Sequence, residues 1–273
     1  MKTEELKLVT TWDKTFPKSE KVDHRKITFM NRYGITLVAD MYIPKNAEGP
    51  FPAIAVSGPF GAVKEQCSGL YAQIMAERGF LTIAFDPSFT GESGGLPRYM
   101  ASPDINTEDF MASVDFLSVQ DNVDAEKIGI IGICGWGGMA INAAALDTRI
   151  KATVASTMYD MTRVNANGYF DSEDSEEARF MKKQAMNALR TEEYKKGEYS
   201  RAGGCADLPV HGDKAHSFYF GKDAYEAMTK DSKYTENKEF LVIPGAVHTD
   251  LYDNLDVIPF NKIQKFFEKN GVC

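Results

Sequence analysis

The segment Gly-Ile-Cys-Gly-Trp-Gly-Gly, residues 132–138, combines a potential nucleophile with several glycines. An apolar run precedes it and small residues follow, so we expect a strand to turn sharply into a helix at Cys134. Such a turn tolerates only small neighbours, because the adjacent backbones would otherwise collide. The thiol would lie at a helix N-terminus, where the dipole favours the thiolate. We therefore predict that Cys134 is a catalytic nucleophile. The alternative is an inert cysteine packed behind a glycine turn.

Trp136 departs from the usual pattern of such a turn, in which the residue two positions after the nucleophile is small. A frame centred on Trp136 obeys the small-residue rule better, but an indole is chemically inert. We expect its side chain to line the substrate pocket, with His216 at the pocket mouth. An ordinary surface histidine is the alternative for His216.

A second candidate lies in the segment IPGAVHTDLYDN, residues 243–254. A predicted strand ends at Ile243 and Pro244, and His248 follows in a loop before the last helix. Enzymes that use a strand-to-helix nucleophile turn deliver the histidine late in the chain, after the nucleophile and the acid. We therefore predict that His248 is the general base for Cys134. A plain loop histidine is the alternative.

The acid of the expected triad is harder to place. In the stretch HGDKAH, residues 211–216, the position where an aspartate commonly stands is Ala215. Asp213 is nearby, and Asp160, which follows the preceding predicted strand, is the other candidate. The alternative for Asp213 is a turn residue without a catalytic role. A thiol tolerates a missing acid better than a hydroxyl does, because it ionises more readily.

The stretch VSGPFG, residues 56–61, follows another predicted strand and indicates an oxyanion hole. Backbone N–H groups in this loop and at Gly135 would stabilise a tetrahedral intermediate. Pro59 has no N–H, so Phe60 is the expected donor beside Gly135, with Gly61 as the second candidate.

The elements that must position these residues alternate along the chain. A hairpin is predicted over residues 26–44, with its turn at 31–34. Apolar runs then alternate with helical patterns, which is typical of a mostly parallel sheet covered on both faces. The further strands are expected at residues 52–58, 80–86, 127–134, 150–157, 208–210 and 239–245. The helices are expected at residues 70–78, from a cap at Thr107, and at 137–147, 224–228 and 259–269.

Residues 161–205 break this alternation with a charged helical stretch. We interpret them as a helical lid within a single domain that spans residues 1–273, because insertions at strand ends usually carry binding function. A solvated surface helix is the alternative. A homodimer through these inserted helices is a further option.

Composition narrows the classes of function. The formal net charge is -8 with both signs interspersed, which argues against nucleic acid and against an anionic membrane surface. The first residues show no apolar run of signal-peptide length, so we expect a cytoplasmic protein. Its four scattered cysteines are expected to be free thiols, and neither they nor the four histidines have metal-ligand spacing. We expect no metal and no cofactor.

Taken in order, these motifs resemble those of the α/β-hydrolase superfamily. The similarity is to its dienelactone-hydrolase-like branch, which includes bacterial relatives of fungal polyketide-tailoring hydrolases, and it covers roughly residues 25–270. The resemblance implies an α/β-hydrolase fold, a Cys or Ser nucleophile, a histidine after the last strand and no cofactor. The motifs are SGPFGAVKEQ, FDPSFTGESGG, GICGWGG, HGDKAHSFYF and IPGAVHTDLYDN.

We therefore expect a hydrolase that cleaves a small or medium ester, lactone or thioester. The thiolate of Cys134 would attack the carbonyl, and water activated by His248 would cleave the acyl-enzyme. Two alternatives stay open. One is a binding protein on a hydrolase scaffold. The other is an acyltransferase or cyclase that excludes water.

Overall fold

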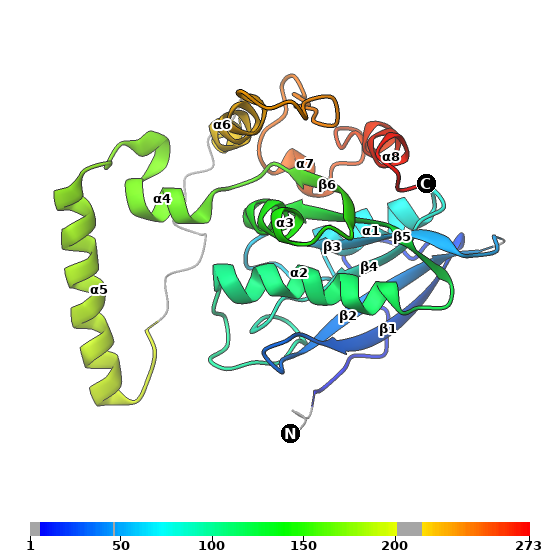
Figure 1. Cartoon of the computed structure of the whole chain (residues 1–273). Coiled ribbons are helices and arrows are strands. Elements are labelled where there is room, and N and C mark those ends of the chain that lie inside the picture. Colours follow the sequence, from blue (N-terminus) through cyan, green and yellow to red (C-terminus); the bar gives the residue numbers. More distant parts are fainter. Residues whose placement is uncertain (1–5, 46, 201–214) are drawn as a thin grey trace.

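A six-stranded sheet forms the centre of the molecule in the computed structural model, which describes residues 6–45, 47–200 and 215–273 (Figure 1). The strand order is β1-β2-β4-β3-β5-β6. The four strands β4, β3, β5 and β6 are parallel, while β1 and β2 are antiparallel to their neighbours. The bounds are β1 Val22–Met30, β2 Thr36–Pro44, β3 Phe51–Ser57, β4 Leu81–Phe85, β5 Val123–Ile133 and β6 Ile150–Ser156.

The predicted hairpin is confirmed as β1 and β2. Its turn closes where the N–H of Gly34 donates to the carbonyl of Asn31, and Gly34 has a φ of 76°. Glycine adopts this left-handed conformation without steric cost.

Helices cover both faces of the sheet, as the alternating pattern predicts. Apolar side chains of α1 (Cys67–Ala76) and α8 (Phe260–Lys269) belong to one core cluster, and those of α2 (Pro103–Ser118) and α3 (Gly135–Leu146) to the other. Strand β3 contributes to both, with Ile54 and Val56 on the first face and Ala53 and Ala55 on the second. The period of two along the strand explains this division.

Helix α2 begins earlier than expected. Its N-cap is Ser102, with Pro103 in the first turn, and Thr107 lies inside the helix. The predicted cap at Thr107 is wrong, because Ser followed by Pro is a strong start signal. The apolar stripe of Phe110, Val114 and Leu117 is fully buried, as predicted.

The chain after β6 is helical and irregular. It contains α4 (Met161–Asn167), the short 3₁₀ helix η1 (Tyr169–Asp171), α5 (Glu176–Lys196), α6 (Phe218–Thr229) and α7 (Asp250–Asp253). The strand predicted at 239–245 is wrong, because no strand forms there. Phe240 instead packs against Phe218 and Tyr225 of α6. The strand predicted at 208–210 lies outside the described residues.

Helix α5 lies within the predicted lid segment and projects away from the sheet (Figure 1). None of its residues is buried, and Phe180, Met181 and Met186 are each at least 60% exposed. Ser175 caps its start, and Gly197, in the left-handed conformation, ends it. Across the described part of the chain, no helix has the length and apolarity needed to cross a membrane.

Candidate active site

Cys134 directly follows strand β5, which pairs with β3 and β6, and is the N-cap of α3. It has a φ of 59° and a ψ of -126°, a conformation that non-glycine residues rarely adopt. Its N–H donates to the carbonyl of Ser156 at 3.0 Å, and its own carbonyl accepts from Gly137 and Tyr159. The side chain is 8% exposed. Backbone strain of this kind clusters at functional sites, where the surrounding structure enforces it.

The glycines around Cys134 allow the close approach of neighbouring backbones. A Cβ on Gly132 would lie 2.2 Å from the carbonyl oxygen of Trp136, and one on Gly138 would lie 2.9 Å from that of Tyr159. Both distances are far below a normal contact, so these positions require glycine.

Trp136 lies in the hydrophobic core of the described structure. Its side chain is 4% exposed and belongs to the core cluster of α2 and α3. The ring stacks against Phe60 with 6.3 Å between centroids, and its Nε1 is buried with no partner in the described part of the chain. Its place in the wall of a substrate pocket stays a prediction. The turn at Cys134 accommodates an indole because the Trp136 side chain packs among apolar residues of α2 and α3.

The two predicted oxyanion donors, Phe60 and Gly135, lie side by side. A Cβ on Gly135 would come within 3.3 Å of the Phe60 side chain. Neither backbone N–H donates to another group within the described ranges. Backbone N–H groups without such a partner can receive a developing oxyanion.

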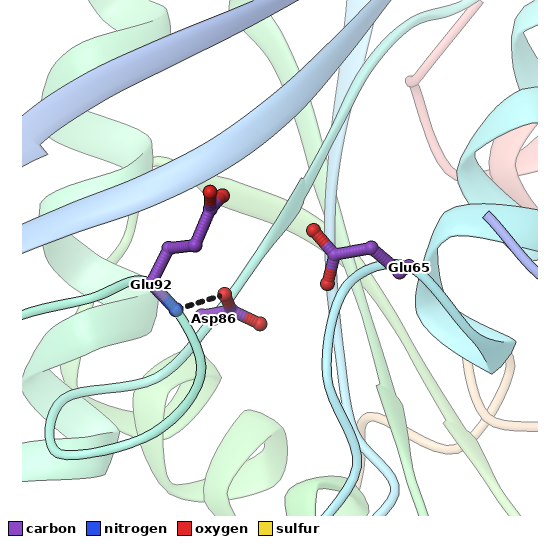
Figure 2. A group of neighbouring side chains, drawn as sticks. All are labelled: Glu65, Asp86 and Glu92. Atoms are coloured by element: carbon purple, nitrogen blue, oxygen red, sulfur yellow. Dashed lines mark hydrogen bonds between the residues drawn. The ribbon is translucent and has the colours of Figure 1, made fainter. Parts of the chain in front are cut away.

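The loop that carries Phe60 is anchored by a buried charge cluster, whose carboxylates are shown in Figure 2. The Nζ of Lys64, which is completely buried, lies 2.5 to 2.8 Å from oxygens of Glu65, Asp86 and Glu92. The backbone N–H of Lys64 also donates to Asp86, at 2.8 Å. These carboxylate oxygens lie within 4.8 Å of one another, a spacing that would suit a metal ion. The ammonium group of Lys64 supplies positive charge at this position, so the cluster ties the loop to the end of β4.

His248 lies in an irregular segment before α7 and is 6% exposed. Its Nδ1 is 2.7 Å from the hydroxyl of Thr157 and 2.7 Å from that of Ser217. Its Nε2 is 2.9 Å from the hydroxyl of Tyr252, which is also hydrogen-bonded to Cys134. Tyr252 therefore links the two predicted catalytic side chains. Burial, together with neighbouring His216, lowers the pKa of His248 to about 4.

Asp160 is not hydrogen-bonded to His248 in the described structure. Asp160 is the N-cap of α4 and accepts from the N–H of Arg163 at 2.8 Å and from the hydroxyl of Thr162 at 2.6 Å. Asp213 lies outside the described residues. Within the described ranges, hydroxyls rather than carboxylates face Nδ1 of His248.

His216 belongs to an aromatic cluster beside His248. Their ring centroids are 4.9 Å apart, and Tyr159 contacts both rings. The hydroxyl of Tyr159 is 2.8 Å from that of Tyr169. This cluster explains how His248 is shielded from water on the side of α4 and α6.

The sequence interpretation missed Tyr252, Thr157 and Ser217. Tyr252 had a signal only in its closeness along the chain, because it lies four positions after His248 in the same motif. Ser217 directly follows the predicted His216. Thr157 had only its position after a predicted strand, which does not reveal a partner distant in sequence.

Comparison with known proteins places this geometry in a family. The family model described as X-Pro dipeptidyl-peptidase (S15 family) matches residues 33–264. Protein PA2218 of Pseudomonas aeruginosa is 48% identical over 97% of this chain and 86% of its own length. Its crystal structure superposes with a TM-score of 0.87 and covers 98% of this chain and 100% of that one.

More distant matches fit the same fold. The thiohydrolase aneE of Aspergillus aculeatus is 31% identical over 50% of this chain, a match that spans only 42% of the fungal protein. The α/β hydrolase GrgF of Penicillium has a TM-score of 0.64 at 17% identity, with 92% of this chain and 100% of that chain covered. The chain thus belongs to the X-Pro dipeptidyl-peptidase (S15) family and is a hydrolase built on the α/β-hydrolase fold.

Proposed function

We propose that this chain hydrolyses a small or medium ester, lactone or thioester through an acyl-enzyme formed on Cys134. The conformation of Cys134 carries the proposal. A strained residue at the carboxyl end of a parallel strand and at a helix N-terminus presents its side chain as a nucleophile elbow does. The hydrogen-bonded route from Cys134 to His248 supplies a path for the thiol proton.

The groups around Cys134 suit acyl transfer. The thiolate would attack the carbonyl carbon, and the oxyanion would be stabilised by the N–H groups of Phe60 and Gly135. The leaving group would depart with the proton held at His248. Water activated by the same imidazole would then cleave the acyl-enzyme.

The similarity to a fungal enzyme narrows the substrate class. The match to a fungal thiohydrolase favours thioesters among the three classes.

We assign residues 161–205 as the cap of this site, of which 161–200 are described. Helix α4 begins soon after β6 and is tied to α6, because Arg163 pairs with Asp223 at 2.8 Å. The part of the cap beside the site would thus be α4, whereas α5 extends away from it.

The first test is the acyl-enzyme itself. The protein would be mixed with S-butanoyl-N-acetylcysteamine or p-nitrophenyl butyrate, quenched in acid and digested for mass spectrometry. We expect a butanoyl group on Cys134. Cys67 is buried to a similar extent, at 6% exposed against 8%, so it serves as an internal control for burial, and exposed Cys273 controls for non-specific acylation.

Turnover of the same two compounds completes the test. Cys134→Ala is expected to lose at least about a thousandfold in kcat/KM, because the nucleophile is removed. The matched variant Cys67→Ala should keep its turnover. If wild type neither turns over nor acquires an adduct with esters, lactones and thioesters, the proposal fails and a binding protein becomes the better interpretation. If the adduct passes only to an added amine or alcohol, the chain is an acyltransferase.

A further inference from the structure

Tyr252 occupies the space between the two predicted catalytic side chains. Its hydroxyl is 2.9 Å from Nε2 of His248 and is hydrogen-bonded to Cys134. The rings of Tyr252 and His248 meet edge to face, with 5.3 Å between centroids. Within the described residues, the hydrogen-bond partners of the ring nitrogens are thus two hydroxyls at Nδ1 and this phenol at Nε2.

The backbone that carries Tyr252 is firmly held. Tyr71, which is fully buried on α1, donates its hydroxyl to the carbonyl of Leu251 at 2.7 Å and also bonds to Ser156 of β6 at 3.1 Å. The carboxylate of Asp250 accepts from the N–H of Val247. These contacts fix α7 against the end of the strand that flanks Cys134, so the phenol is positioned rather than free to swing.

The hydrogen bonds around His248 allow a proton to pass from Cys134 to the imidazole through Tyr252. A neutral imidazole has one donor and one acceptor nitrogen. If Nδ1–H donates to Thr157 or Ser217, Nε2 accepts the hydroxyl proton of Tyr252, and the phenol oxygen is left to accept from Cys134. Burial and the nearby Cys134 raise the pKa of Tyr252, so the phenol stays neutral and passes protons on without retaining a charge.

We propose that Tyr252 is a catalytic proton relay between Cys134 and His248, an inference that rests on the proposed function. As the sulfur–carbon bond forms, the thiol proton moves to the phenol oxygen while the phenol's own proton moves to Nε2. The carbonyl electron pair goes to the oxyanion. The transfer ends with a neutral Tyr252 and an imidazolium at His248. The reverse transfer then protonates the leaving group as its bond to carbon breaks.

The test compares Tyr252→Phe with Tyr42→Phe. Tyr252→Phe removes the hydroxyl but keeps the ring, and kcat/KM should fall by about a hundredfold, the lower range for a lost acid–base group, with little change in KM. Tyr42→Phe removes a buried hydroxyl of β2 that has no hydrogen-bond partner in the described part of the chain, so it should retain wild-type kinetics. Wild-type kinetics in Tyr252→Phe would overturn the relay.

A second measurement uses the wild-type protein alone, so it does not depend on whether a variant folds. In mixtures of H₂O and D₂O, the rate constant for acylation of wild type is measured against the deuterium fraction. The plot should curve rather than follow a straight line, because two protons move in the same step. A straight line would mean one transferred proton and would overturn the relay. Failure of the relay differs from failure of the proposed function, because in the first case wild type still forms the Cys134 adduct and in the second it does not.

Discussion

The structure holds Cys134 and His248 by different kinds of contact. Cys134 ends a strand that is paired on both sides, with β3 and with β6, and its own N–H and carbonyl are hydrogen-bonded to backbone groups. His248 lies outside regular structure, and its ring is fixed by hydroxyls of Thr157, Ser217 and Tyr252. The nucleophile is therefore positioned by the fold, whereas the base is positioned by a few side chains.

This difference predicts where the molecule tolerates change. At Gly132, backbone packing leaves no space for one added carbon, whereas at Gly221, near His248 in the fold, the nearest atom belongs to a side chain. His248 itself is buried among hydroxyls, with no acidic partner in the described part of the chain, and burial lowers its pKa.

The largest effect is expected from Gly132→Ala. The new Cβ would lie 2.2 Å from the carbonyl oxygen of Trp136, and such overpacking against backbone should cost at least about 3 kcal/mol in the free energy of unfolding. The matched change on the histidine side is Gly221→Ala in α6, where the nearest atom is a Phe240 ring carbon at 3.3 Å. It should alter stability by no more than about 1 kcal/mol. Urea unfolding followed by circular dichroism measures both, and equal losses would contradict the comparison.

A slightly smaller effect is expected from Lys64→Met, which removes the ammonium group that lies within 2.8 Å of Glu65, Asp86 and Glu92, the carboxylates drawn in Figure 2. Removing one partner of a buried ion pair costs about 3–5 kcal/mol. We expect the loss here to lie at the lower end of that range, because Lys26 still pairs with Glu92 and a carboxylate can take up a proton. The control is Lys182→Met on α5, whose partner Glu173 is 56% exposed. Surface pairs contribute about 0–1 kcal/mol. Comparable midpoints in urea for the two variants would show that the Lys64 cluster is not a stabilising anchor.

The smallest of the three effects is the pH dependence from His248. Its folded pKa of about 4 lies below the value of about 6.5 expected in the unfolded chain. Between these values the unfolded state binds a proton that the folded state does not, so stability falls as pH decreases through this window, by up to about 3 kcal/mol. Urea unfolding at pH 7, 5.5 and 4 should show this loss, with a shallower slope in His248→Gln. Parallel slopes would assign the acid sensitivity to other groups.

Much of the structure around Cys134 could be predicted from the sequence. Apolar runs bounded by glycine and proline identify buried parallel strands, and the glycines at 132, 135, 137 and 138 identify the turn at Cys134. These signals are local, because each strand carries its own pattern. The surroundings of Trp136 could not be predicted, since only tertiary packing decides whether an indole enters the core or a pocket.

The surroundings of His248 were harder to predict, because its contacts come from residues distant in sequence. Thr157 and Ser217 lie 91 and 31 residues from His248, and no periodicity connects them. The run of residues 239–245 is apolar enough to suggest a strand, yet Phe240 packs on α6 instead. Short apolar runs are ambiguous in this way, since burial against a helix satisfies them as well as pairing does.

The contact between Trp136 and Phe60 gives the molecule a built-in optical reporter. The chain has two tryptophans, and the other, Trp12, packs against Phe16 and His24 near the start of the chain. In a Trp12→Phe background, all tryptophan emission would come from the indole stacked beneath the loop that supplies Phe60. Occupation of the site next to Gly135 would then be visible as a change in fluorescence, with no label attached and with any substrate, coloured or not.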